Sequence, residues 1–218
     1  KGLCLAAVPA REDVRDVALT ADSGPLQDLA HGALVGSGSP RRQGQLRARY
    51  PFLQFAEIRG NIDTRIRKVR AGEYAATILA RAGLKRLNLP EKDGEILPLS
   101  LMLPAPGQGA LGLECRANDR RTRRLLGVLN QPGAAACVSA ERACLAGLGG
   151  GCHLPLGAYA SIRKGILTLR AVLVSPDGKL AVRVKVASSA SDARRLGREA
   201  AQKIKESAAG KAILAALG

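Results

Sequence analysis

Short apolar runs alternate with polar, amphipathic segments along the first half of the chain. Between residues 33 and 89 the order strand, turn, helix occurs three times. The strands are predicted at ALVGSGS, FLQFAEI and YAATILA, and a segment of helical character follows each of them. This alternation predicts an α/β domain with a largely parallel sheet.

The first of these helices has a clear start signal. Ser39 is a good N-cap and Pro40 suits the first helical position. In α/β folds, ligands bind at the carboxyl ends of strands, where helix N-termini present free N–H groups. One anion pocket is therefore favoured, because four arginines fall near a strand end or early in the next helix: Arg41, Arg42, Arg59 and Arg65.

The alternation of strands and helices does not continue beyond residue 97. The segment 97–116 is rich in proline and glycine at its centre, which predicts a loop or hinge. From about residue 131 onward, strands that follow one another and then a helix predict a small α+β domain. The other predicted elements are strands at 2–9 and 14–19, a short helix ending at Gly32, helices at 119–129, 134–148 and 190–207, a short C-terminal helix, and three strands within 158–187.

Charge adds a candidate function to this outline. The 218 residues carry a net charge of +16, and twelve Lys or Arg against three Asp or Glu lie between residues 41 and 86. A basic stretch of this kind is either an anion-binding surface or a solvated face, and charge alone leaves both open. A nucleic-acid-binding protein is one alternative, although only 2% of the residues are aromatic, which disfavours stacking on single strands. No apolar run approaches the ~20 residues of a membrane span.

The cysteines favour a reducing compartment. There are five, none in a CxxC pair, and only two histidines accompany them, so a zinc site is not expected. We therefore expect a cytoplasmic protein without a metal. Cys152 stands out because it follows three glycines and precedes His153 in a basic setting. It is either a nucleophile on an open loop or an incidental cysteine in a glycine turn.

Four longer motifs, in order, carry a resemblance. They are VGSGSPRRQGQL, IRGNIDTRIRKVRAGEYAATILARAGLKRL, LPAPGQGALGLECR and ERACLAGLGGGCHLPLGAY. Together they resemble the porphobilinogen deaminase family, also called hydroxymethylbilane synthases, over essentially the whole chain. The resemblance implies a transferase of tetrapyrrole (haem and chlorophyll) biosynthesis. It would join four porphobilinogen units into hydroxymethylbilane and release ammonia at each step.

The resemblance also implies a cofactor and its contacts. A dipyrromethane primer would be held by a thioether to Cys152, and the glycines before it would make the loop that carries the primer flexible. Arginines would bind the acetate and propionate groups of the growing chain, because a guanidinium makes fixed, charge-assisted bonds to carboxylates. By the family's motif, Ser37, Ser39, Arg41 and Arg42 would contact the cofactor and Arg59, Arg65 and Arg86 the substrate, while Arg67, Lys68 and Arg70 would form a solvated helix face.

The domain plan implied by the resemblance has three α/β domains, of which the first two resemble periplasmic binding proteins. Residues 10–108 would form the second domain, which binds the anion. Residues 131–218 would form the C-terminal α+β domain, which carries the cofactor cysteine. Residues 1–9 and 109–130 would be remnants of the first. A monomer without membrane or specific nucleic-acid partners is expected.

Some positions depart from the family's pattern. The binding turn is Ser37-Gly38-Ser39-Pro40 where Thr-Ser-Ser-Leu is frequent, and Gly149 replaces a frequent Glu. The His-Ser-x-Lys-Asp motif, whose aspartate is the family's catalytic acid, is not found, and neither Asp13 nor Asp16 matches it. The catalytic residue is thus unknown, and we expect a chain that lacks most of its first domain and has little activity.

A second alternative is a receptor with the same α/β fold. A non-catalytic receptor would bind porphobilinogen or other carboxylates reversibly and would not need Cys152. Replacing Cys152 by Ser separates the two hypotheses, because a receptor keeps its ligand whereas a deaminase loses its cofactor.

Overall fold

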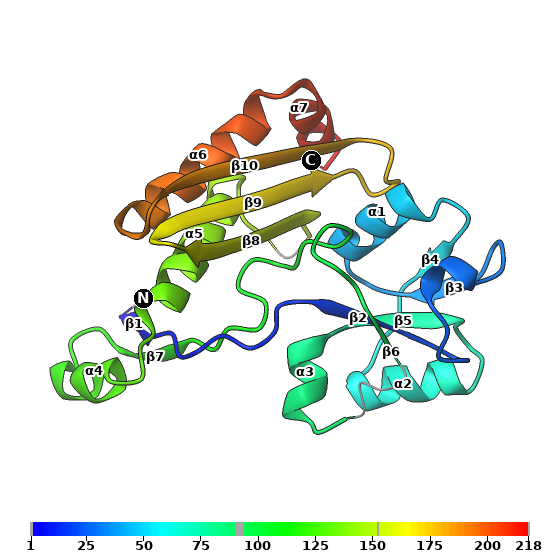
Figure 1. The fold of residues 1–218 in the computed structure, drawn as a ribbon, viewed down its shortest axis with the longest axis horizontal. Coiled ribbons are helices and arrows are strands. Elements are labelled where there is room, and N and C mark those ends of the chain that lie inside the picture. The colour runs from blue at the N-terminus through cyan, green and yellow to red at the C-terminus, as the bar shows by residue number, and fades with distance from the viewer. Residues whose placement is uncertain (1, 90–93, 152, 218) are drawn as a thin grey trace.

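The computed structural model describes residues 2–89, 94–151 and 153–217, and it contains three separate sheets (Figure 1). A five-stranded sheet with three helices forms one part, and a three-stranded antiparallel sheet with helices α5 to α7 forms another. A two-stranded ribbon with helix α4 projects beside them. Within the described ranges, no helix combines the length and the apolar character that a membrane crossing requires.

The five-stranded sheet has a mixed strand direction. Its order is β4-β3-β5-β2-β6. Strand β3 runs parallel to β4 and β5, whereas β2 is antiparallel to both β5 and β6. The expectation of a largely parallel sheet is therefore wrong for the β2–β6 half. The strands are β2 (Asp16–Thr20), β3 (Leu34–Gly36), β4 (Gln54–Ala56), β5 (Ala76–Ala80) and β6 (Gly94–Ile96).

Apolar side chains fill both faces of this sheet. Successive residues of β2 alternate between them, so that Val17 joins one apolar cluster and Ala18 the other. Leu46 of α1 packs into the cluster with Ala18, and Leu84 of α3 into the cluster with Val17. Because the strands of this sheet are buried on both faces, their sequences are apolar runs and do not alternate between apolar and polar residues. The helices are α1 (Pro40–Arg49), α2 (Ile62–Arg70) and α3 (Arg81–Arg86), and a 3-10 turn, Leu26–Asp28, stands where a short helix was predicted.

The C-terminal part follows the prediction closely. Its three antiparallel strands lie in the order β10-β9-β8. Helices α5 and α6 pack on one face of them, and their apolar residues form one cluster with the strands, including Cys144, Leu169 and Leu196. The elements are β8 (Leu156–Arg163), β9 (Ile166–Val174), β10 (Ala181–Ser189), α5 (Pro132–Gly147), a 3-10 turn (Ala190–Asp192), α6 (Ala193–Glu206) and α7 (Ala208–Ala215).

The third sheet is a two-stranded ribbon. Strand β1 (Leu3–Ala7) pairs antiparallel with β7 (Leu113–Arg116), and α4 (Arg120–Gly127) packs beside them. Strand β7 lies inside the segment that was predicted to be a loop. Two chain segments, 8–15 and 97–112, run from this ribbon to the five-stranded sheet (Figure 1).

Candidate functional site

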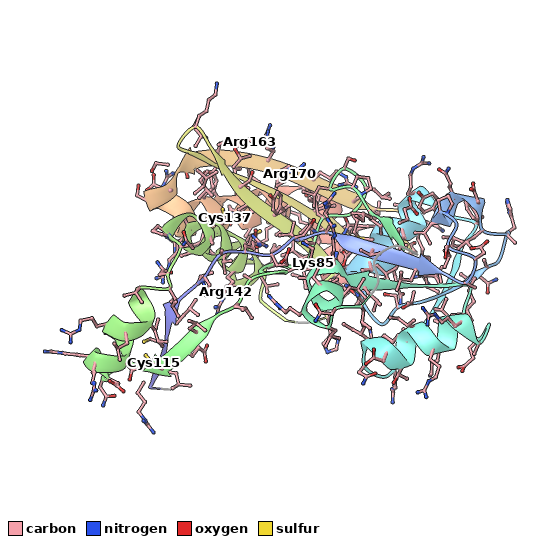
Figure 2. The ribbon with its side chains drawn as sticks, turned by 60° about the horizontal axis from the view of Figure 1, so that its bottom comes forward. Lys85, Cys115, Cys137, Arg142, Arg163 and Arg170 are labelled. Atoms are coloured by element: carbon pink, nitrogen blue, oxygen red, sulfur yellow. The ribbon has the colours of Figure 1, made fainter. Side chains whose placement is uncertain are left out.

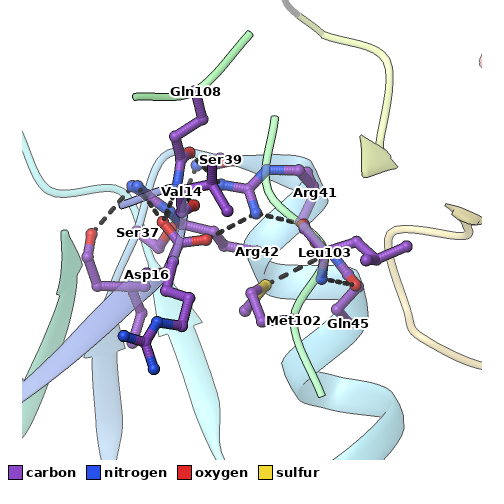
Figure 3. A network of polar contacts seen from close by, with 12 residues as sticks. Val14, Asp16, Ser37, Ser39, Arg41, Arg42, Gln45, Met102, Leu103 and Gln108 are labelled. Carbon is purple, nitrogen blue, oxygen red and sulfur yellow. Dashed lines mark hydrogen bonds and ion pairs between the residues drawn. The ribbon is translucent and has the colours of Figure 1, made fainter. Parts of the chain in front are cut away.

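A buried carboxylate with two arginines lies at the edge of the five-stranded sheet (Figure 3). Asp16 begins β2 and is fully buried. Oδ2 of Asp16 lies 2.8 Å from Nη1 of Arg41, and Oδ1 lies 2.8 Å from Nη2 of Arg42. Because β2 runs antiparallel to β5, its first residue lies at the edge where the parallel strands end.

The segment 97–112 completes this network. Nη1 of Arg41 also donates to the carbonyl of Leu103 at 2.8 Å. Nε2 of Gln108 donates to Oδ1 of Asp16 at 3.1 Å, and its Oε1 accepts from Arg41 at 3.3 Å. Gln45 holds the backbone of Leu103 from both sides, donating to its carbonyl and accepting from its N–H. Residues of α1, of β2 and of the segment 97–112 together thus hold Arg41 and Arg42 in place.

Electrostatics keep Asp16 ionised. Burial raises the pKa of a carboxyl, but the charges of Arg41 and Arg42 outweigh it and hold the pKa of Asp16 at about 2. Burial lowers the pKa of Arg41, and the adjacent Asp16 opposes that shift. Two guanidinium groups around one carboxylate leave an excess of one positive charge at the start of α1, where backbone N–H groups also favour an anion.

The predicted serines lie in the turn that starts α1. Ser37 is buried and its Oγ accepts from the N–H of Ser39 at 3.3 Å. Ser39 is the N-cap residue, but its side chain makes no capping hydrogen bond. Gly38 is exposed, and a Cβ added to it would lie 3.5 Å from the side chain of Glu57. The turn after β3 therefore lies beside the turn after β4.

The three predicted substrate arginines are closer to solvent. Arg59 follows β4, its side chain is 84% exposed, and it pairs loosely with Glu57 at 3.3 Å. Arg65 lies in α2 and its Nε donates to the carbonyl of Gly60 at 2.9 Å. Arg86 ends α3 and its Nη2 donates to the carbonyl of Gly109 at 3.3 Å. Among the described residues, none of these three contacts Asp16, whose carboxylate is bound by Arg41, Arg42 and Gln108.

A second charged cluster, which the sequence analysis did not assign, lies in the segment 11–15. Asp13 is paired with Arg15 at 2.6 Å and with Arg81 at 2.5 Å. The hydrogen bond from Arg15 is the main cause that lowers the pKa of Asp13. Asp13 and Arg15 border a cavity of about 700 Å³ against the C-terminal part, together with Lys85 and Tyr159. The alternating charges of REDVRD are the signal that could have revealed it.

The three glycines after α5 have backbone conformations that favour glycine. Gly149, Gly150 and Gly151 have φ values of +100°, +60° and +147°, which residues with a side chain rarely adopt. A Cβ added at Gly149 or Gly151 would meet nothing within 4 Å. Cys152, the predicted tether, lies outside the described residues.

Two family models match nearly all of the chain. Residues 1–124 match "Porphobilinogen deaminase, dipyromethane cofactor binding domain", and residues 135–206 match "Porphobilinogen deaminase, C-terminal domain". A solved periplasmic binding protein from Brucella ovis with glutathione bound aligns at 16% identity with a TM-score of 0.39, over 66% of this chain and 43% of that protein.

Curated relatives share a higher sequence identity with this chain than that solved structure does. Porphobilinogen deaminase of Nitrosomonas europaea is 46% identical over 216 residues, which are 99% of this chain and 70% of that protein. The Chromobacterium violaceum enzyme of the same name is 46% identical over 217 residues, again 99% of this chain and 70% of the relative. The chain belongs to the porphobilinogen deaminase family.

Proposed function

We propose that this chain binds porphobilinogen and the growing polypyrrole at the arginine-rich edge of the five-stranded sheet. In this proposal a dipyrromethane primer is tethered through Cys152, and four porphobilinogen units are joined into hydroxymethylbilane with release of ammonia. The observation that carries the proposal is the pair Arg41 and Arg42 around Asp16, which leaves one positive charge in excess at a helix N-terminus. Each pyrrole unit brings an acetate and a propionate, which are suitable counterions.

The residues present fit a polycarboxylate. The Arg42 side chain is 13% exposed and that of Arg41 only 5%, so Arg42 presents more of its guanidinium at the surface. Arg59 is free to turn toward a ligand, because its ion pair with Glu57 is exposed and long. Ser39 keeps a hydroxyl that is not used for capping. Ser37, Arg65 and Arg86 would complete the binding surface around the turns after β3 and β4 and the end of α3.

The cofactor, when bound, supplies the primer on which the pyrrole chain is extended. The chain's own residues would hold it and orient its carboxylates. Arg41 and Arg42 are held rigid by Asp16 and Gln108, so little conformational entropy is lost when they bind. The open glycine run before Cys152 gives the tether room to move.

Two organisational points belong to the same proposal. Residues 10–108 would act as the anion-binding domain and residues 131–218 as the cofactor-carrying domain, with 1–9 and 109–130 belonging to a further one. Three separate sheets support this division. We also propose a monomer in the cytoplasm, and five cysteines without framework spacing support a reducing compartment.

Intact mass under denaturing conditions tests the proposal directly. The chain is measured before and after incubation with preformed hydroxymethylbilane, and peptide mapping locates any adduct. A pyrrole adduct on Cys152, formed when its sulfur displaces the bilane's hydroxyl group as water, is expected and should be absent in Cys152→Ser; it has four rings, or two if a bridge bond is then hydrolysed. An unmodified Cys152 in a chain that melts cooperatively would contradict the tether.

The same samples separate the alternatives. A carboxylate receptor would bind the bilane reversibly, and Cys152→Ser would bind it as tightly as the wild type. A nucleic-acid-binding protein would prefer RNA or DNA over the bilane at equal salt, whereas binding that falls steeply with salt is the nonspecific attraction of a basic chain.

A further inference from the structure

Two cysteines face each other across the two-stranded ribbon. Cys4 of β1 and Cys115 of β7 are direct partners in the antiparallel register. Their Sγ atoms lie 4.0 Å apart. Facing residues in such a pair have Cα atoms about 4.5 to 5.5 Å apart, and disulfides span Cα separations of about 4.4 to 6.8 Å. Side-chain rotation can therefore join the two sulfurs while the strands keep their pairing.

The two thiols have different surroundings. Cys4 is half-buried and Cys115 is buried. Burial is the main cause that raises the pKa of the Cys115 thiol, and its contact with Cys4 adds to the shift. Cys4 is therefore the more accessible thiol, and Cys115 is placed to react with it second.

Cationic side chains surround the entrance to Cys4. A cavity of about 320 Å³ is lined by Cys4 together with Arg120, Arg123 and Arg124 of α4. All three arginines are exposed. Among the described residues, none of the three forms an ion pair, and Asp119 is the acidic group closest to them along the chain. An anion that approaches Cys4 would thus meet three guanidinium groups.

We propose that Cys4 and Cys115 form a redox-active dithiol site that reacts with small anionic disulfides, of which oxidised glutathione is an example. The Cys4 thiol loses its proton to solvent and its sulfur attacks one sulfur of the oxidant. The disulfide bond of the oxidant breaks, and the first glutathione leaves as a thiolate that takes up a proton.

The second step releases the other half of the oxidant. Cys115 loses its proton and attacks the Cys4 sulfur, the mixed disulfide breaks, and the second glutathione leaves as a thiol. In total the two cysteines lose two electrons and two protons, and one oxidised glutathione becomes two glutathione thiols. The site is separate from the arginine-rich edge of the five-stranded sheet, and Figure 2 shows Cys115 on the ribbon, away from Cys137 and Lys85.

The bond would close a long loop. Cys4 and Cys115 are 111 positions apart, and the whole five-stranded sheet lies between them. The disulfide would therefore fasten together the two chain segments that lead into that sheet. A cross-link of this span restricts the unfolded chain, so oxidation is expected to raise the thermal midpoint by several degrees, roughly 5 °C or more.

The test uses the reduced full chain and oxidised glutathione. After reaction, remaining thiols are alkylated and the peptides are mapped under non-reducing conditions. We expect one cross-linked peptide pair that contains Cys4 and Cys115. In Cys115→Ser, Cys4 is expected to retain one glutathione, and in Cys4→Ser, Cys115 is expected to remain a free thiol.

Other outcomes would overturn the proposal. These are free thiols at both positions in the oxidised wild type, cross-links mainly to Cys137 or Cys144, or an unmodified Cys4 in Cys115→Ser. Cys115→Ala is tested in parallel, because a buried serine hydroxyl can destabilise the ribbon. The thermal midpoint of each reduced variant shows that it is folded.

A second arm tests the preference for an anionic oxidant. In the double variant Arg120→Ala/Arg124→Ala, oxidation by glutathione disulfide is expected to slow about threefold or more, while oxidation by the neutral 2-hydroxyethyl disulfide is unchanged. Arg163→Ala, an exposed arginine of β8, is the matched control and should slow neither reaction. An unchanged rate with glutathione disulfide in the double variant, or an equal slowing with both oxidants, would contradict the preference for an anionic oxidant.

Discussion

Arg11 and Glu141 form a buried two-point ion pair, with Nη1 2.7 Å from Oε1 and Nη2 2.9 Å from Oε2. Arg11 lies in the segment that leads into the five-stranded sheet, and Glu141 lies on α5. The same carboxylate accepts hydrogen bonds from the N–H groups of Gly107 and Ala160, both at 2.7 Å. Glu141 therefore ties both connecting segments to the three-stranded sheet.

Replacing Glu141 by Gln should destabilise the chain strongly. The variant leaves the charge of Arg11 in a site where its side chain is only 11% exposed. Breaking one partner of a buried pair costs about 3 to 5 kcal/mol. Urea unfolding followed by circular dichroism measures the change.

An exposed carboxylate on a neighbouring helix provides the control. Glu199 pairs with Lys203 one turn along α6, and the two side chains are 39% and 53% exposed. Glu199→Gln should change the free energy of unfolding by about 0.5 kcal/mol or less. Similar losses of the free energy of unfolding in the two variants would show that the pair of Arg11 and Glu141 stabilises the chain no more than an exposed ion pair does.

Asp16 should make stability depend on acid pH. Its pKa is about 2 in the folded chain against 3.8 as the ordinary value, so the folded state binds its proton less readily than the unfolded state. The resulting stabilisation is present above pH 3.8 and is lost as the pH falls toward 2. It amounts to about 2 kcal/mol.

The measurement compares wild type with Asp16→Asn. Free energies of unfolding are taken from urea titrations between roughly pH 5 and pH 2. The wild type should lose about 2 kcal/mol more over this range than the variant, because other carboxylates titrate in both. Parallel curves would mean that Asp16 is not paired as the structure has it.

For the exposed arginines, the prediction concerns the binding of hydroxymethylbilane and not the stability of the chain. Arg59→Ala should weaken binding of preformed hydroxymethylbilane about tenfold, because one charge-assisted contact to a carboxylate is lost. Arg67→Ala, on the exposed face of α2, should bind as the wild type does. Isothermal titration calorimetry measures both. Equal weakening in the two variants would indicate a diffuse basic surface instead of a site.

Arg42 should not tolerate lysine. Its Nε and Nη2 both donate to Oδ1 of Asp16, and its Nη1 donates to the carbonyl of Ile78 at 3.0 Å. An ammonium group cannot make this planar set of contacts, so Arg42→Lys should cost about 1 to 3 kcal/mol of stability. Arg59→Lys, which changes an exposed side chain, is the control. An Arg42→Lys chain with the wild-type urea midpoint would contradict this role.

The sequence predicted the local elements better than their arrangement. Helix α1 begins at Pro40 as predicted, because proline at the first helical position is a local signal, although the Ser39 side chain makes no capping hydrogen bond. The direction of β2 was not predictable, since an apolar run buried on both faces does not reveal which neighbour it pairs with. Likewise the segment 97–116 was predicted as a loop, but β7 forms there because β1, more than a hundred residues away, supplies its partner.

The site was predictable to a similar extent. The two arginines after the turn were found from helix-start signals, whereas their shared partner Asp16 depends on the antiparallel placement of β2. Gln108 stands in a Pro- and Gly-rich segment whose path follows from tertiary packing. A polar residue in such a segment gives no local signal that its side chain is directed inward.

A glycine of α1 marks the contact between the five-stranded part and the C-terminal part. A Cβ at Gly44 would lie 2.7 Å from the carbonyl oxygen of Ser175 and 2.8 Å from Cγ1 of Val174. On the next turn of the same helix, Nη1 of Arg47 donates to the carbonyl of Pro176 at 2.6 Å. Helix α1 can approach the end of β9 this closely only because residue 44 has no side chain.

Gly44→Ala should therefore destabilise the chain by about 1 to 3 kcal/mol, because the added methyl group must displace backbone or shift the helix. Gly127→Ala is the matched control: it lies in α4 with nothing within 4 Å of an added Cβ. Alanine has the higher helix propensity, so this control should be neutral or stabilise by up to about 1 kcal/mol. Urea unfolding compares the two, and a Gly44→Ala chain as stable as Gly127→Ala would show that α1 does not pack against the end of β9.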